Sequence, residues 1–406
     1  MGMFILLIFL TIFTSVFASI TDDIKTLVLK KNALTIDEVV AQLPEDLRKN
    51  FTLVYKGRAL LQTSYEFPAA ILFGKDGKVL LSFNGSPTQR GFSSLDVLEY
   101  NEDSQEYKAS RFLFSPSARE LKAARTAERI GNTDVHYEPK PRTCMGCHGM
   151  PEHPIFESSY PEWKGFYGSQ RDHLYGTHLK PEIEGFERFR IIGKPTPRYQ
   201  ALIFPSENGS SMSPYMDEGT SLSAHEYRPN LVFGSYLVRT NAKTIFKYMK
   251  KSPEFEKYKA LLTLSLQKCS LAKLDQETIT GIDSLAAKVR KDSQSLKLNS
   301  SYFLNPELHL NRTVAAKLIS IMGISSDFWN LAVRGNGRSP EYGYWSGYGD
   351  TLNFVHAELI RDLFGIEMKS HYQEIKFNES LGDAFEARDQ ASSCELIWKK
   401  FLKPSR

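Results

Sequence analysis

The stretch AAILFGKDGKVLLSF, residues 69–83, decides the fold of the N-terminal part of the chain. Two apolar runs, residues 69–73 and 79–83, flank a turn that contains the pair Asp76-Gly77. Asp-Gly between apolar runs is a strong hairpin signal, because a tight turn of this kind needs residues that tolerate positive φ. The stretch therefore predicts two antiparallel strands.

A second hairpin is predicted directly downstream. Residues 95–100 and 107–114 have strand character, and the polar residues 101–104 between them form the predicted turn. Two adjacent hairpins predict a small antiparallel sheet with one buried face.

Helices are predicted on both sides of this sheet. Residues 19–50 predict short helices, one of which starts at a capping box formed by Thr35 and Glu38. Residues 115–130 predict a further helix that follows the second hairpin.

From Asn241 onward, the apolar residues recur at helical spacing and predict a mostly helical region. The predicted helices cover residues 253–267, 312–322, 354–364 and 394–401. Residues 335–349 are rich in glycine and aromatic residues and predict a packed loop, since their spacing does not match a phosphate-binding motif.

The run Cys144-Met145-Gly146-Cys147-His148 carries the clearest chemical signal. The spacing C-x-x-C-H is the attachment signature of a c-type haem. Cys144 and Cys147, about one helical turn apart, would form thioethers with the two vinyl groups of one haem. His148 would then bind the iron as an axial ligand. The sequence therefore predicts one covalent haem c.

Other interpretations of the two cysteines remain open. A zinc site would need two more ligands, usually a second close pair, and the chain has no such cysteine pair. A thioredoxin-like dithiol is expected after a buried strand, whereas residues 138–143 have the character of a loop.

The N-terminus predicts export. Residues 4–18 are apolar but too few to span a bilayer comfortably, and Val16-Phe17-Ala18 fits a signal-cleavage site. Residues 1–18 are therefore predicted to be a signal peptide and the protein to be periplasmic or otherwise exported. The alternative is an uncleaved N-terminal anchor, because residues 1–3 lack Lys and Arg.

Cysteine usage and charge limit the function further. Cys269 and Cys394 remain beside the two motif cysteines, and in an oxidising compartment we expect them to form a disulfide, with two buried thiols as the alternative. The net charge of +4 is not concentrated in a basic block, so no nucleic-acid partner is expected. No further run is long enough to predict a membrane span.

The sixth iron ligand decides between electron transfer and ligand binding. Met212 and His178 are the leading candidates, and His136 is among the other histidines that flank the region. The aromatic residues after the motif suit the covering of an apolar haem face, and an ordinary aromatic core is the alternative. They are Phe156, Tyr160, Trp163, Phe166 and Tyr167.

The segment from Pro141 to Ser169 resembles a family of large exported proteobacterial proteins that carry a single cytochrome c motif and are mostly uncharacterised. The similarity rests on Cys144 to Gly149, Pro154, Tyr160-Pro161, Trp163 and Gly165-Phe166-Tyr167-Gly168. It extends to residues 70–73 and 83–85 and to Arg228-Pro229-Asn230, roughly the first two-thirds of the chain. The resemblance implies a periplasmic haem c protein without a known substrate. This chain departs from the family at residues 153–156, where relatives tend to have Arg-Pro-Asn-Trp.

The sequence as a whole predicts an α+β protein. It has a small N-terminal antiparallel sheet, a haem-attachment segment with few regular elements, and a mostly α-helical C-terminal half. The predicted regions are a signal peptide (1–18), an N-terminal α+β region (19–130), a haem c region (131–235) and a helical C-terminal region (236–406). The predicted function is redox or electron transfer with an unknown redox partner protein. The alternatives are a haem-dependent oxidoreductase with peroxidase-like or small-oxide chemistry and a haem-based sensor or binding protein.

Overall fold

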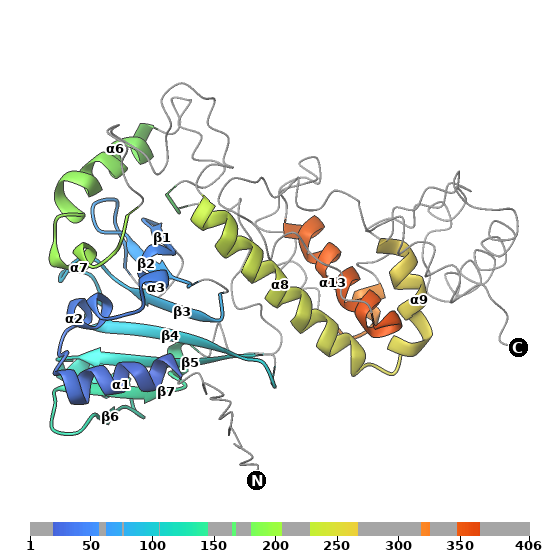
Figure 1. Ribbon diagram of the computed structural model, residues 1–406, viewed down its shortest axis with the longest axis horizontal. Coiled ribbons are helices and arrows are strands. Elements are labelled where there is room, and N and C mark those ends of the chain that lie inside the picture. The colour runs from blue at the N-terminus through green and yellow to red at the C-terminus, as the bar shows by residue number, and fades with distance from the viewer. Residues whose placement is uncertain are drawn as a thin grey trace, which may run out of the picture.

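The computed structural model describes residues 19–56, 62–74, 77–104, 106–144, 165–167, 180–204, 228–266, 318–324 and 347–365. Within these residues the N-terminal half forms a seven-stranded sheet in which all pairings are antiparallel (Figure 1). The spatial order is β1-β2-β3-β4-β5-β7-β6. The strands are β1 (Phe51–Val54), β2 (Ala69–Leu72), β3 (Val79–Phe83), β4 (Ser94–Asn101), β5 (Glu106–Phe114), β6 (Glu128–Arg129) and β7 (Val135–Pro139).

Both predicted hairpins are confirmed. Strands β2 and β3 pair antiparallel, with Ala70 opposite Phe83, and β4 pairs with β5 from Ser94 to Asn101. Gly77, in the β2–β3 turn, has φ of 65°, and a Cβ atom there would lie 2.6 Å from the side chain of Tyr236. Glycine is required at this turn because both the backbone angle and the close neighbour exclude a side chain.

One face of the sheet is apolar and buried. Leu53, Ala70, Leu81, Val97 and Phe112 have no exposed surface and belong to one continuous core. The first helices supply the other side of this core and are α1 (Ile20–Lys31), α2 (Ile36–Ala41) and α3 (Glu45–Lys49). Figure 1 shows α1 in front of β5 and β7 and running along them, and Lys25 of α1 lies over the ring of Tyr137 on β7.

The predicted capping box at the start of α2 is confirmed. The Glu38 backbone N–H donates to Thr35 Oγ1 over 3.2 Å, and the Thr35 N–H donates to the Glu38 carboxylate over 3.0 Å. The cap lets α2 present Ile36, Val39 and Val40 to the core.

The predicted helix over residues 115–130 is wrong for most of its length. Helix α4 (Ala118–Ala123) is short and has no buried residue, and β6 follows it. Strand β6 pairs with β7 across a turn in which Gly131 has φ of 55°. The hairpin pairing therefore prevails over the helical propensity of this segment, and the pair Gly131-Asn132 is the sequence signal for it. The predicted region boundary at residue 130 falls inside this hairpin.

A second helical group covers the same apolar face near β1 to β3. It consists of α6 (Lys180–Arg188), the π-helix η2 (Phe189–Gly193) and α7 (Pro197–Gln200). Phe189 and Tyr199 are fully buried in the core cluster, and the Tyr199 hydroxyl donates to the Pro68 carbonyl over 2.6 Å.

The described C-terminal elements are helical. They include α8 (Arg228–Lys250), α9 (Phe255–Leu266) and α13 (Gly347–Phe364), and Figure 1 shows α8 and α13 side by side. The predicted helices at 253–267 and 354–364 are confirmed, and α13 begins at Gly347, inside the predicted loop. The predicted helix at 312–322 is described only from residue 318, and the one at 394–401 lies outside the described residues.

Helix α8 contacts the turns at one end of the sheet. The Phe233 ring stacks on Phe73 with centroids 5.1 Å apart, and Lys247 Nζ donates to the Ser104 carbonyl over 2.7 Å. None of the helices in the described ranges combines the length and apolar character needed to cross a membrane.

Candidate functional site

Cys144, the first cysteine of the C-x-x-C-H run, lies just beyond the end of β7. Lys140, the next residue after the strand, has φ of 51° and donates its N–H to the Ala109 carbonyl of β5 over 3.0 Å. The chain then turns at Pro141, whose carbonyl accepts the Cys144 N–H over 2.9 Å. This turn brings the Cys144 thiol back against the sheet.

The partner of the thiol is Arg111 on β5. Arg111 Nη2 lies 3.2 Å from Cys144 Sγ, and Nη1 donates to Thr143 Oγ1 over 3.1 Å. The guanidinium is also paired with Asp96, with Nε 2.5 Å from Oδ1 and Nη2 3.4 Å from Oδ2. A single guanidinium therefore connects the turn that carries Cys144 to the middle of the sheet.

Three charged residues form a row across adjacent strands. Asp96 of β4 is the register partner of Arg111, and Arg111 is the register partner of Glu138 on β7. Side chains alternate between the faces of a strand, so this charged row lies on the face opposite Leu95, Val97 and the helices. We call Asp96, Arg111 and Glu138 the charged row.

The charged row is largely withdrawn from solvent. The side chains of Arg111, Asp96 and Glu138 are 15%, 19% and 5% exposed. Glu138 Oε2 lies 3.9 Å from Arg111 Nη1 and accepts no hydrogen bond. Burial therefore raises the pKa of Glu138, against the lowering effect of Arg111. Burial also disfavours the charged form of Arg111, but Asp96 raises its pKa overall, so the guanidinium stays charged.

The Cys144 thiol is held in its neutral form. Burial and the negative charge of Asp96 raise its pKa to about 12, against the opposing effect of Arg111. Reactive dithiols depend on a lowered thiol pKa. The surroundings of Cys144 therefore do not favour the thioredoxin-like interpretation.

The other predicted site residues lie outside the described residues. They are Cys147, His148, Met212 and His178, together with the predicted disulfide partners Cys269 and Cys394 and the predicted signal peptide at 1–18. Their roles therefore stay predictions.

Among the flanking histidines, His136 is the one that falls in the described part of the chain, and it lies near the charged row. It stands two residues before Glu138 on β7 and so lies on the same face of the sheet. Its Nδ1 atom is buried and makes no hydrogen bond. A buried polar atom without a partner is unusual, and His136 is thus a second polar group with unused hydrogen-bonding capacity on this face.

Of the aromatic residues after the motif, Tyr167 is part of the ordinary core. It is 1% exposed, its ring centroid lies 5.0 Å from that of Phe186, and its hydroxyl donates to the Tyr65 carbonyl over 2.9 Å. Phe166 bridges Val54 at the edge of β1. At Tyr167, the interpretation as an ordinary aromatic core is therefore correct. Phe156, Tyr160 and Trp163 lie outside the described residues.

The charged row was not predicted from the sequence. Asp96 and Arg111 each lie between apolar or small residues in a strand, a pattern that indicates a solvent-facing position. Only the pairing of β4, β5 and β7 places the three charges side by side. A charge that recurs at the same register position of neighbouring strands is the signal that could have identified them.

Comparisons with known proteins identified no relative of this chain. No protein-family model matches this chain, and neither the curated proteins nor the solved structures contain a significant match. Across the described ranges, no group of three or more His, Cys, Asp or Glu side chains is arranged to hold a metal ion.

Proposed function

We propose that this protein is an exported mono-haem c-type cytochrome that acts in redox or electron transfer. The observation that carries the proposal is the run Cys144-Met145-Gly146-Cys147-His148. Cys144 and Cys147 would hold the haem through thioethers, and His148 would be the axial iron ligand. The haem would supply a one-electron couple between ferric and ferrous iron.

The described residues around Cys144 fit a covalently attached haem. The thiol is neutral and half-buried, and a thioether sulfur, like the thiol, is uncharged and can accept the weak hydrogen bond from Arg111. The other side of the guanidinium is fixed by Asp96, so Arg111 would hold the Cys144 sulfur in place after attachment. Thr143, the residue before Cys144, accepts a hydrogen bond from Arg111 Nη1, and this contact would fix its position.

The remaining elements of the proposal rest on the sequence. Met212 or His178 is the proposed sixth ligand, and the haem-attachment segment is proposed to contain few regular elements. The helices α8, α9 and α13 are consistent with a mostly α-helical C-terminal half. Export, through the predicted signal peptide at residues 1–18, would bring the chain to the compartment where cytochromes c receive their haem. A redox partner protein of unknown identity would exchange the electron.

Pyridine haemochrome analysis of the exported protein tests the proposal. We expect the spectrum of a haem with both vinyl groups saturated, and we expect the colour to stay with the protein after denaturation and acid–acetone extraction. Cys144→Ala combined with Cys147→Ala should abolish the signal. Cys394→Ala is the matched control, since it removes a cysteine outside the motif and should leave the signal intact. A colourless exported protein whose motif thiols react with an alkylating reagent would contradict the proposal.

A further inference from the structure

The start of helix α1 is tied to the sheet by Glu99 of β4. The hydroxyl of Ser19, the N-cap of α1, lies 2.9 Å from both Glu99 carboxylate oxygens, and Thr21 Oγ1 donates to Oε2 over 2.5 Å. Thr21 is 6% exposed, and its Oγ1 also lies 3.3 Å from the Ser110 hydroxyl on β5. Glu99 faces the helices because it stands two residues after Val97 of the core. The first residues of α1 are therefore held by two strands.

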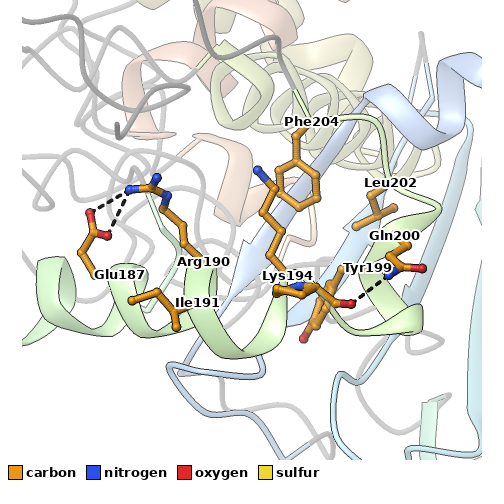
Figure 2. Close-up of a pocket in the computed structure, with 9 residues that line it drawn as sticks. Glu187, Arg190, Ile191, Lys194, Tyr199, Gln200, Leu202 and Phe204 are labelled. Atoms are coloured by element: carbon orange, nitrogen blue, oxygen red, sulfur yellow. Dashed lines mark hydrogen bonds and ion pairs between the residues drawn. The ribbon is translucent and has the colours of Figure 1, made fainter. Parts of the chain in front are cut away.

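Glu99 has no cationic partner among the described residues. Its register partner on β5, Lys108, is exposed, and no ion pair joins the two side chains. Figure 2 shows the more usual case of a carboxylate with its cation, in which both Glu187 oxygens contact Arg190 Nη1, at 3.2 and 3.0 Å. The two hydroxyl donors at Glu99 are neutral, and a carboxylate offers about four acceptor sites. Glu99 can therefore accept a further, charged donor.

Negative charge gathers at this end of α1. Asp22 and Asp23 lie in the first turn of the helix, and burial and the negative charges of Asp22 and Glu99 raise the pKa of Asp23. Within the described part of the chain, Lys25 is the cation in contact with this group. Its Nζ lies 3.8 Å from Asp22 Oδ1 and 3.9 Å from the centroid of the Tyr137 ring. A further positive charge at this end of α1 would therefore be stabilised.

The chain can supply this charge itself. The predicted signal cleavage hydrolyses the Ala18–Ser19 peptide bond, so that water is consumed, Ala18 leaves with a carboxylate and Ser19 gains an α-ammonium group. The α-nitrogen and Oγ of a serine are only about 3–4 Å apart. The new ammonium group would thus form within reach of the carboxylate that Ser19 Oγ already contacts. The cut would leave α1 complete, since its first residue, Ile20, is 7% exposed and packs in the core.

We propose that Glu99 binds the α-ammonium group of Ser19 after signal cleavage and thereby locks α1 onto the sheet. This inference rests on the export that is part of the proposed function, and it does not depend on haem attachment. A positive charge at the N-terminus of a helix is unfavourable by itself, because it meets the positive end of the helix dipole. The carboxylates of Glu99, Asp22 and Asp23 offset this effect. Processing would therefore make the folded protein more stable than its precursor.

A removable tag between the signal peptide and Ser19 tests the proposal. Its protease site leaves Ser19 as the first residue, so that urea denaturation can compare one exported preparation before and after tag removal. In the unaltered protein, removal should lower the equilibrium constant for unfolding about fivefold or more, because a charge-assisted pair forms at a partly buried carboxylate. In Glu99→Gln, removal should change this constant less than about twofold, since the pair cannot form.

Glu128→Gln is the matched control, because Glu128 is an exposed carboxylate on β6. It should gain as much stability on tag removal as the unaltered protein does. Mass spectrometry of the untagged exported chain should show Ser19 as its first residue. A different first residue, no gain in the unaltered protein, or an equal gain in Glu99→Gln would overturn the proposal. A colourless chain that begins at Ser19 and shows the gain would support this inference while it contradicts haem attachment.

Discussion

The two faces of the sheet differ sharply although they are built from the same strands. On one face, Val97 and Phe112 are completely buried under helices. On the other, the neighbouring residues Asp96 and Arg111 form an ion pair that continues to Glu138. A shift of one residue along β4 or β5 therefore leads from an apolar core to a buried group of charges.

This difference indicates that the two faces serve different purposes. Apolar burial stabilises the fold, whereas buried ion pairs are often no more stabilising than apolar residues of the same size. Arg111 also contacts the sulfur of Cys144 and the hydroxyl of Thr143. The charged face is thus better understood as the support for the motif than as a source of stability.

The largest expected effect lies on the apolar face. Phe112→Ala should lower the free energy of unfolding by about 3–5 kcal/mol, because it removes a large ring from a filled core. Urea denaturation followed by circular dichroism measures the loss. Lys108→Ala, at an exposed position of the same strand, is the control and should change stability by less than about 0.5 kcal/mol. Similar losses for both variants would contradict the assignment of the faces.

The next effect tests the charged row. Arg111→Met should cost about 3 kcal/mol, because it leaves the Asp96 carboxylate largely buried without its cation. Adding Asp96→Asn should recover part of this loss, since the uncompensated charge is removed. Denaturation of the two single variants and the double variant gives the coupling between the residues. Purely additive losses would show that the two side chains do not act as a pair.

These two faces also show what the sequence could and could not predict. The pair Asp76-Gly77 and the capping box at Thr35 are local signals, and the β2–β3 hairpin and the helix start that they predict are both confirmed. The β6–β7 hairpin was missed because residues 118–130 have helical propensity while the pairing depends on a strand that comes later. The charged row was missed for a similar reason, since β7 joins Glu138 to Arg111 only through the tertiary fold.

For the candidate site, the sequence predicted the chemical role of Cys144 but not its surroundings. The motif predicts that Cys144 forms a thioether, but the contact between Cys144 and Arg111 depends on a strand register that the sequence does not specify. The π-helix η2 was not predicted at all. A π-helix leaves no clear sequence pattern, and its apolar residues resemble those of an ordinary amphipathic helix.

A smaller loss of stability is expected from removing helix caps, and two caps can be compared. Thr35→Ala should lower stability by about 1 kcal/mol, because α2 packs Ile36, Val39 and Val40 into the core. Ser117→Ala removes the same kind of capping box from α4, which buries no residue, and should affect global unfolding much less. Thermal or urea unfolding of both variants makes the comparison. A larger loss for Ser117→Ala would contradict the assignment of α2 to the core.

The smallest effect is a change in pH dependence. The pKa of Glu138 is raised in the folded protein, so as the pH rises above its ordinary value near 4.5 the unfolded chain loses the proton first. Glu138 therefore lowers stability with rising pH, and Glu138→Gln should remove this contribution above pH 4.5 and change little below it. Urea denaturation of both proteins from pH 4 to 8 measures the difference. A stability difference that is constant over this range would show that Glu138 titrates alike in both states.

Intact-protein mass spectrometry of the exported chain tests the central claim most directly. The account predicts a denatured protein that carries the mass of one haem, and a second preparation with Cys144→Ala and Cys147→Ala that has the mass of the polypeptide alone. An exported, folded protein whose unaltered chain has only the polypeptide mass, with Cys144 and Cys147 both free to react, would contradict it.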